Sequence, residues 1–275
     1  MKKTAPHFPA FSCCALAASL AFAPLLAQAL AQGGGEASPP AAQPGPYAAY
    51  LNGQQQSPAC PEAFTAVYRV AYPQGTGSPL ADLVIANFAR SLEGGFLTDT
   101  LNPVLGARDL CDDKFVVTME TGYEISVPSA GHLSVVFTAE SYAGGAHPAR
   151  RTSVLNFQGG GFLLDIAYLF PGDRDAGIDK FWGGLYRVTC AAGKGTMPSF
   201  YGGHPCQGDD APPAGAFRDG VKEVADLGNL SFTPGGATVH LDPYDGWSWA
   251  DGPQEFAFTK GELIGMGANP AVWGR

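Results

Sequence analysis

Two short segments of the sequence combine glycine or proline with polar and aromatic side chains, and these residues are the best suited to contact a ligand. Residues 141–147 read Ser-Tyr-Ala-Gly-Gly-Ala-His, and the two glycines allow a sharp turn or the close approach of a partner. Residues 242–251 hold three aromatic side chains and three carboxylates. Aromatic rings beside acids suit both sugar stacking and the binding of a basic protein. The predicted ligand contacts are Ser141, Tyr142, Gly144, Gly145, His147, Asp242, Pro243, Tyr244 and Trp247.

Some of these side chains also have a purely structural interpretation. His147 can donate a hydrogen bond to a backbone carbonyl and so hold its own loop in place. Trp247 and Trp249 can belong to the hydrophobic core, because large aromatic side chains are often buried. Both interpretations stay open at the level of the sequence.

The remaining polar residues show none of the spacings that mark known catalytic or metal sites. The histidines beyond the N-terminal segment are His132, His147, His204 and His240, and none lies in an H-E-x-x-H pattern. The acidic run at 173–179 lacks the ligands of a calcium loop and is more typical of a helix N-terminus. Serine-hydrolase, P-loop and dinucleotide motifs are absent from the sequence. We therefore predict no catalytic residue, no metal and no cofactor.

The composition of the chain places it among globular proteins with many turns. Of 275 residues, 45% are hydrophobic and only 15% are charged, while glycine contributes 37 residues and proline 23. This composition can form a hydrophobic core, and it excludes collagen-like, coiled-coil and fully disordered chains.

The first 31 residues have the features of a secretory signal peptide. Lys2 and Lys3 precede an uncharged apolar stretch at 11–26, and an A-x-A cleavage pattern follows at 27–29 or at 29–31. The stretch is short for a spanning helix and contains Pro24. Two cysteines lie at its front, whereas a lipoprotein cysteine follows the apolar stretch. We expect a periplasmic or secreted protein with no membrane span after cleavage.

Removal of this segment makes the chain more acidic. The formal net charge falls from −9 to −11, because two lysines and no acid are lost. An acidic chain disfavours nucleic acid as a partner, since phosphate contacts need clustered lysine and arginine. The charge either attracts a cationic partner or serves only to keep the protein in solution.

Four cysteines remain after cleavage, and an even number in an exported chain predicts two disulfides. Three pairings are possible. Cys60–Cys111 and Cys190–Cys206 are favoured because each joins segments close in the sequence. A zinc site is the weaker alternative, because the chain has no C-x-x-C spacing.

The pattern of apolar residues predicts a single α+β domain. Residues 32–57 are expected to form a flexible leader of Gly, Pro, Ala and Gln. The domain then covers 58–270, with an N-terminal part at about 58–148 and a C-terminal part at about 149–270. A first strand is predicted at 64–72. The first helix is expected to begin after Ser78 and to stop at Gly94-Gly95.

The middle of the chain predicts hairpins. Alternating residues at 115–127 and 133–142 flank a Pro-Ser-Ala-Gly turn, which predicts an antiparallel pair with one face in water. A third strand is expected at 152–157, a second helix from about 175, and further strands at 230–232, 237–241 and 254–258. Two main helices packed on antiparallel hairpins, without regular βαβ units, define the predicted fold class.

Several short motifs in this order resemble a family of exported bacterial domains that includes the ectodomain of the anti-sigma factor RsiV and the N-terminal region of the peptidoglycan deacetylase PdaC. The resemblance covers residues 62–265. Its motifs are Tyr72-Pro73, Ser141-Tyr142-x-Gly144-Gly145-Ala146-His147, Leu155-Asn156-Phe157, Leu164-Asp165-Ile166, Leu169-Phe170, Leu241-Asp242-Pro243-Tyr244, Gly252 and Phe256-Ala-Phe258.

The resemblance implies an RsiV-ectodomain-like fold, a place in the cell envelope and, in the RsiV branch, the binding of lysozyme. An anti-sigma role is not expected, because a cleavable signal stands where RsiV-type proteins have a cytoplasmic segment and a membrane helix. Deacetylase activity is not expected either, because the chain ends at Arg275 with no room for the catalytic domain of PdaC.

These observations favour a non-catalytic binding module that recognises a lysozyme-like protein or a cell-wall glycan. One alternative is a hydrolase of envelope glycan or peptide that uses His147 or His240, and it requires histidines and two or more carboxylates to converge in one cleft. Another is a scaffold of an envelope complex, which requires a large exposed apolar patch.

Overall fold

The computed structural model describes residues 46–56, 64–105, 115–144, 147–192, 229–243, 250 and 252–274. All of them belong to one unit, Gln43–Arg275. The predicted α+β class is confirmed, with two sheets of mostly antiparallel strands and two main helices.

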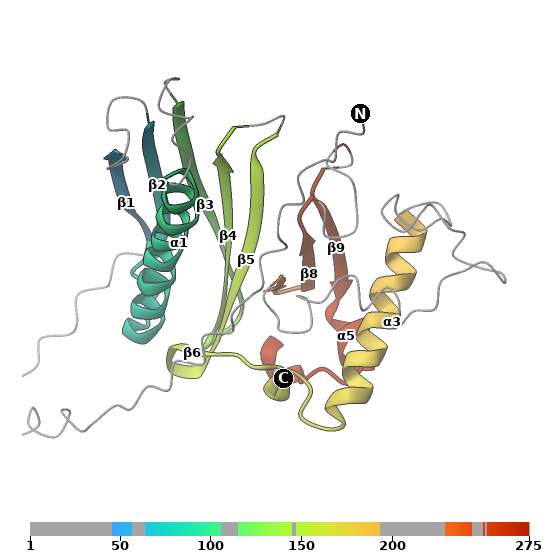
Figure 1. Ribbon diagram of the computed structural model, residues 1–275. Helices are drawn as coiled ribbons and strands as arrows, with labels where there is room; N and C mark the ends of the chain where they lie inside the picture. Colours follow the sequence, from blue (N-terminus) through green and yellow to red (C-terminus); the bar gives the residue numbers. More distant parts are fainter. Residues whose placement is uncertain are drawn as a thin grey trace, which may run out of the picture. The chain divides into compact units, whose positions relative to one another are not determined.

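The larger sheet has six strands that are neighbours in the same order as in the sequence (Figure 1). They are β1 (Tyr47–Gln56), β2 (Phe64–Gln74), β3 (Phe115–Ser129), β4 (His132–Tyr142), β5 (Ala149–Gln158) and the short β6 (Phe162–Leu163). Every neighbouring pair is antiparallel except β2 and β3, which are parallel.

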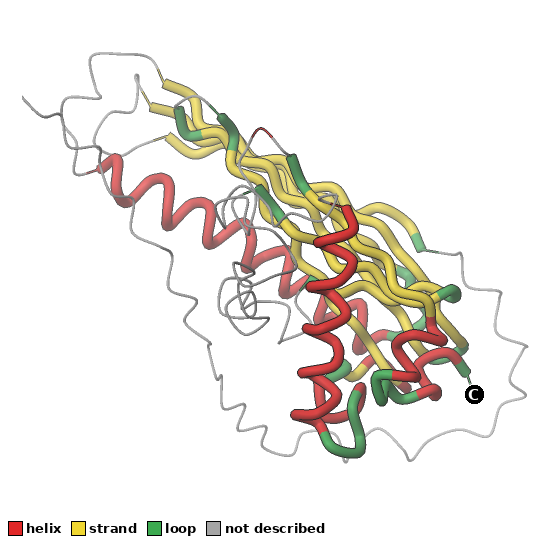
Figure 2. Tube along the Cα trace, turned by 90° about the vertical axis from the view of Figure 1, so that its right-hand side faces the viewer, coloured by secondary structure: helices red, strands yellow, loops and turns green. Residues whose placement is uncertain are grey.

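The parallel pair forms one βαβ unit in a fold that was predicted as hairpins without regular βαβ units. Helix α1 (Pro79–Leu105) is the crossover between β2 and β3, because parallel neighbours cannot be joined by a tight turn. The helix lies along one face of the sheet (Figures 1 and 2). At its start Ser78 Oγ accepts a hydrogen bond from Ala81 N at 3.3 Å, as the predicted N-cap requires.

The predicted end of this helix at Gly94-Gly95 is wrong. The helix continues for ten residues, to Leu105. Glycine in a helix costs about 1 kcal/mol relative to alanine, which weakens a helix without ending it. Beyond the glycines, Phe96 is buried in the core between α1 and the sheet, and this burial favours the helical continuation.

The predicted flexible leader also needs correction, because residues 47–56 form strand β1. All ten pair with β2, from Tyr47 opposite Gln74 to Gln56 opposite Thr65. Backbone hydrogen bonds to β2 and the apolar contacts of Ala49 and Leu51 with the core hold a segment whose composition predicts a loop.

The β3–β4 hairpin is confirmed, with Gly131 in the left-handed conformation (φ +85°) at its turn. The prediction that one face of the hairpin is exposed to water is wrong in the middle of β4. Ser134 and Val136 are buried there, in addition to Val135 and Phe137, which pack toward α1. A second sheet covers the face that carries Ser134.

That second sheet consists of β7 (Leu230–Thr233), β8 (Gly236–Leu241) and β9 (Gln254–Thr259), all antiparallel. Its core includes residues of α3 (Arg174–Ala192) and α5 (Lys260–Gly265), for example Phe181 against Phe258. The shorter helices are α2 (Ile166–Leu169) and the 3₁₀ turns η2 (Gly159–Gly161) and η6 (Pro270–Trp273). None of the helices in the described part of the chain combines the length and apolarity that a membrane crossing needs.

The two sheets meet through polar side chains that bind backbone groups of β7. Phe232 N donates to Ser134 Oγ at 2.8 Å, and Asn156 Nδ2 donates to the Leu230 carbonyl at 2.7 Å. Ser134 also donates to Asn156 Oδ1. Because every member of this group is buried and bonded, it fixes the edge of β7 against the face of β4 and β5.

Candidate functional site

A row of charged side chains crosses the sheet on the face opposite α1. In the strand register, Arg69 of β2 lies opposite Glu120 of β3, which lies opposite Glu140 of β4, which lies opposite Arg150 of β5. Arg69 and Glu120 form an ion pair at 3.6 Å, and Arg150 and Glu140 form another at 3.7 Å. The two carboxylates are therefore direct neighbours, with an arginine on each outer side.

A depression of about 430 Å³, within the size range of small-molecule sites, overlies this row. Its lining residues come from β2, β3, β4 and the end of the β4–β5 connection. They are Val67, Tyr68, Arg69, Thr118, Met119, Glu120, Glu140, Ser141, Tyr142 and Pro148. Ser141 and Tyr142, two of the predicted ligand contacts, thus line it, and the Tyr142 side chain is 41% exposed.

Aromatic and apolar side chains of the same sheet face extend this surface toward β1. The Arg69 guanidinium carbon lies 4.6 Å from the ring centre of Tyr50, within the range of a cation–π interaction. Val67 and Val116 are also exposed. We call Tyr50, Arg69, Glu120, Glu140 and Tyr142 the open-face cluster. Its apolar neighbours alternate with charged side chains, unlike the large apolar patch that the scaffold alternative requires.

Tyr68 borders the depression by its position in β2, but its side chain packs against the core on the α1 face, where it meets Glu93 of α1. A hydrogen bond with Glu93 raises the pKa of the Tyr68 hydroxyl above its usual value, and burial and the negative charge of Glu93 act in the same direction. That phenol lies on the α1 face, so the negative charge at the depression comes from Glu120 and Glu140.

Asp242, another predicted contact, lies at the end of β8 and is bound to β5. Its carboxylate accepts from Thr152 Oγ1 at 2.7 Å and from Thr152 N, and it lies 3.8 Å from Arg150 Nε. Asp242 is buried, as is Pro243. Arg150 also pairs with Glu140, the residue directly before the 141–147 segment, so one arginine links Asp242 to the end of β4.

The structure describes only some of the other predicted site residues. Gly144 adopts a left-handed conformation (φ +88°), and His147 lies exposed before β5. Gly145, Tyr244 and Trp247 lie outside the described residues, as do Cys60, Cys111 and Cys206. Cys190 is buried on α3. The ligand roles and the disulfide pairings therefore stay predictions.

The described histidines lie at three separate places. His147 follows β4, whereas His132 begins β4 and contacts Ser129 Oγ at 3.0 Å and the Tyr168 hydroxyl at 3.2 Å. Burial lowers the pKa of His132 below its usual value, partly offset by a hydrogen bond with the backbone of Ala130. His240 lies on β8 in the second sheet.

His240 lies between a serine and a glutamate, at distances that resemble those of a hydrolase triad. Its Nε2 lies 2.9 Å from Ser231 Oγ, and its Nδ1 lies 3.1 Å from Glu255 Oε1. Accessibility argues against a nucleophile here, because Ser231 is only 4% exposed while the Glu255 side chain is 64% exposed. The hydrolase alternative required two carboxylates, and this arrangement supplies one.

The described residues contain no group of three or more His, Cys, Asp or Glu side chains arranged to hold a metal ion. The arrangement at the open-face cluster suits binding by charge and aromatic contact. Sequence reasoning missed Arg69 and Glu120 in this cluster, because only the strand register shows that they lie beside Glu140 and Tyr142.

Comparison with known proteins finds likeness in the fold. No model of a protein family matches the chain, and no curated protein does. A crystal structure of a DUF3298 family protein from Pseudomonas aeruginosa aligns with 85% of this chain and 99% of its own, at 15% identity and a TM-score of 0.51. The fold is DUF3298-like. A DUF3298 family member from Bacteroides fragilis aligns with 82% of this chain and 95% of its own, at 15% identity and a TM-score of 0.45.

Proposed function

We propose that this chain is an exported, non-catalytic binding module of the cell envelope that recognises a lysozyme-like protein or a peptidoglycan-derived ligand. We also propose that it belongs to the DUF3298 family and shares its origin with the RsiV ectodomain and the N-terminal region of PdaC. The sequence motifs support the second link, and the DUF3298-like fold supports the first.

The observation that carries the proposal is the position of Tyr142 beside Glu120 and Glu140 at one depression. Two carboxylates directly opposite each other repel, and among the described residues each of them is paired with one arginine. A cationic side chain of a partner that lies between them would relieve this repulsion. Tyr142 supplies an aromatic ring at the depression that suits contact with a sugar or with the stem of an arginine.

Isothermal titration of the chain with lysozyme, and separately with soluble muropeptides, tests the proposal. Saturable heat with lysozyme that weakens with added salt identifies a cationic protein partner. Saturable heat with muropeptides that is insensitive to salt identifies a glycan. No heat with either ligand would overturn the proposal.

Single substitutions locate the binding surface. We expect Glu140→Gln and Tyr142→Ala to weaken binding about tenfold or more, because both residues line the depression. Glu124→Gln is the matched control, because it makes the same charge change on an exposed position of β3 outside the depression. Equal losses in Glu124→Gln and Glu140→Gln would place the binding surface elsewhere.

A further inference from the structure

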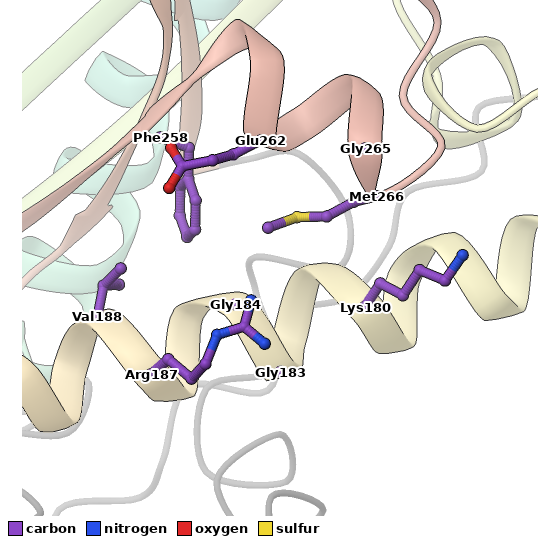
Figure 3. A pocket seen from close by; sticks show the side chains of 9 residues that line it. All are labelled: Lys180, Gly183, Gly184, Arg187, Val188, Phe258, Glu262, Gly265 and Met266. Carbon is purple, nitrogen blue, oxygen red and sulfur yellow. The ribbon is translucent and has the colours of Figure 1, made fainter.

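The second depression, of about 380 Å³, lies between α3 and the β9–α5 segment and shares no residue with the first (Figure 3). Its floor is apolar and its edge is charged. The lining residues are Lys180, Gly183, Gly184, Arg187, Val188, Phe258, Glu262, Gly265 and Met266. Phe258 and Met266 point from the β9–α5 side toward α3, and Val188 points back toward them (Figure 3).

The two adjacent glycines of α3 have different surroundings. A Cβ on Gly184 would lie 2.6 Å from Met266 Cε and 3.3 Å from a ring carbon of Phe258, so Gly184 is needed for the close packing of the helix. A Cβ on Gly183 would meet nothing within 4 Å. Gly183 therefore weakens the helix by about 1 kcal/mol, and no packing contact requires it. Its absent side chain keeps the groove open.

The charges at the groove favour an anion. Arg187 and Lys180 lie on the same side of α3, two turns apart. Glu262 also lines the groove and its negative charge attracts Arg187, so the lining carries two cations and one carboxylate. That carboxylate accepts from Thr259 N at 2.7 Å and Thr259 Oγ1 at 2.8 Å, which holds it at the cap of α5. In Figure 3 the Arg187 side chain lies along the groove beside Gly184, while Lys180 extends away from it.

We propose that this groove binds a single-chain amphiphile with a carboxylate head. The apolar chain lies over Gly183, between Val188, Phe258 and Met266. The head pairs with Arg187, whose planar guanidinium matches a carboxylate in a bidentate contact, and Lys180 adds its charge at longer range. The site is independent of the open-face cluster, so either proposal can fail without the other.

Titration of the full chain with octanoate tests this site, with acetate and octyl glucoside as matched probes. Acetate has the head without the chain, and octyl glucoside has the chain without the charge. We expect saturable binding of octanoate to one site and at least tenfold weaker binding of both other probes. Absence of saturable octanoate binding, or equal binding of octyl glucoside, overturns the proposal.

Two pairs of variants test whether octanoate binds in this groove. Arg187→Met is expected to weaken octanoate binding about ten- to a hundredfold, the loss typical of a charge-assisted contact. Arg174→Met, on the same helix but outside the groove, leaves it unchanged. Gly183→Leu fills the groove and abolishes binding, whereas Gly95→Leu, at an equally open glycine of α1, does not.

Both glycine substitutions also raise thermal stability, because leucine favours a helix over glycine. A gain in melting temperature with a loss of octanoate binding in Gly183→Leu therefore separates a filled site from an unfolded protein. Unchanged binding in Gly183→Leu or in Arg187→Met overturns the assignment of the groove.

Discussion

The contact of Asp242 with Thr152 predicts that Asp242→Ala strongly destabilises the fold. Both residues are buried, and the carboxylate accepts from the backbone N–H and the hydroxyl of Thr152. Removing it leaves two buried donors without this acceptor, at a cost of about 1–3 kcal/mol each. The ion pair with Arg150 adds less than about 1 kcal/mol, because at 3.8 Å to a partly exposed arginine it is long and screened. The expected total is about 3–5 kcal/mol.

Urea denaturation followed by circular dichroism measures this loss as a lower midpoint at an unchanged slope. Thr152→Val removes one donor and is expected to cost about 1–2 kcal/mol. The double variant should cost less than the sum of the single losses, because both substitutions remove the same hydrogen bond.

Glu120→Ala is the control for a change of charge at the surface. Its side chain is 72% exposed, and its attraction to Arg69 is offset by repulsion from Glu140, so we expect a change within about 0.5 kcal/mol. An Asp242→Ala variant within about 1 kcal/mol of the wild type, or strictly additive losses in the double variant, would refute the reasoning.

Three further predictions concern other elements. Gly94→Ala, at an open position within α1, should stabilise the protein by about 1 kcal/mol and raise its melting temperature by about 2–4 °C in calorimetry; no gain would mean that the helix ends there. Thr259→Ala removes the cap of α5, in which Glu262 N donates to Thr259 Oγ1. It should cost about 1 kcal/mol in urea denaturation at pH 7. Hydrogen bonds from Thr259 lower the folded pKa of Glu262 below 4.5, so this difference should shrink as pH falls below that value. Burial lowers the pKa of His132 below 6.5, so the unfolded chain binds the proton first. Wild-type stability should therefore decline more than that of His132→Gln between pH 7 and 5, and parallel profiles would contradict this.

The strands predicted from alternation correspond to those in the structure, because one face of each packs on a core. Strand β1 was missed because its Ala, Gln and Gly residues show no such alternation, and long-range pairing with β2 holds it in place. The helical spacing of apolar residues predicts a buried stripe on α1 made of Leu80, Leu83, Val84, Phe88 and Leu92, and the observed stripe differs. Leu80 and Leu83 are exposed, while Ala81 and Ile85 face the sheet, because the close approach of helix and sheet selects small residues along with large ones.

Of the residues at the candidate site, only those that lie together in one sequence motif could be predicted. Ser141 and Tyr142 follow a strand with two glycines close behind, and this local pattern identified them. Glu120 lies beside Arg69 only because of the parallel register of β2 with β3, whereas the antiparallel β3–β4 hairpin places it opposite Glu140. Asp242 was predicted from its motif, but its bond to Thr152, 90 residues away in the sequence, depends on the packing of the two sheets.

The parallel pairing of β2 with β3 has a consequence for the order of folding. The β3–β4–β5 segment is joined by short connections and can form its pairs early, since short loops close at the lowest entropic cost. Strand β2 reaches β3 only after the segment containing α1 has crossed over. The contact between Asp242 and Thr152 closes a still longer loop. Breaking that contact is therefore expected to speed unfolding and to leave the folding rate nearly unchanged, the signature of an interaction formed after the transition state.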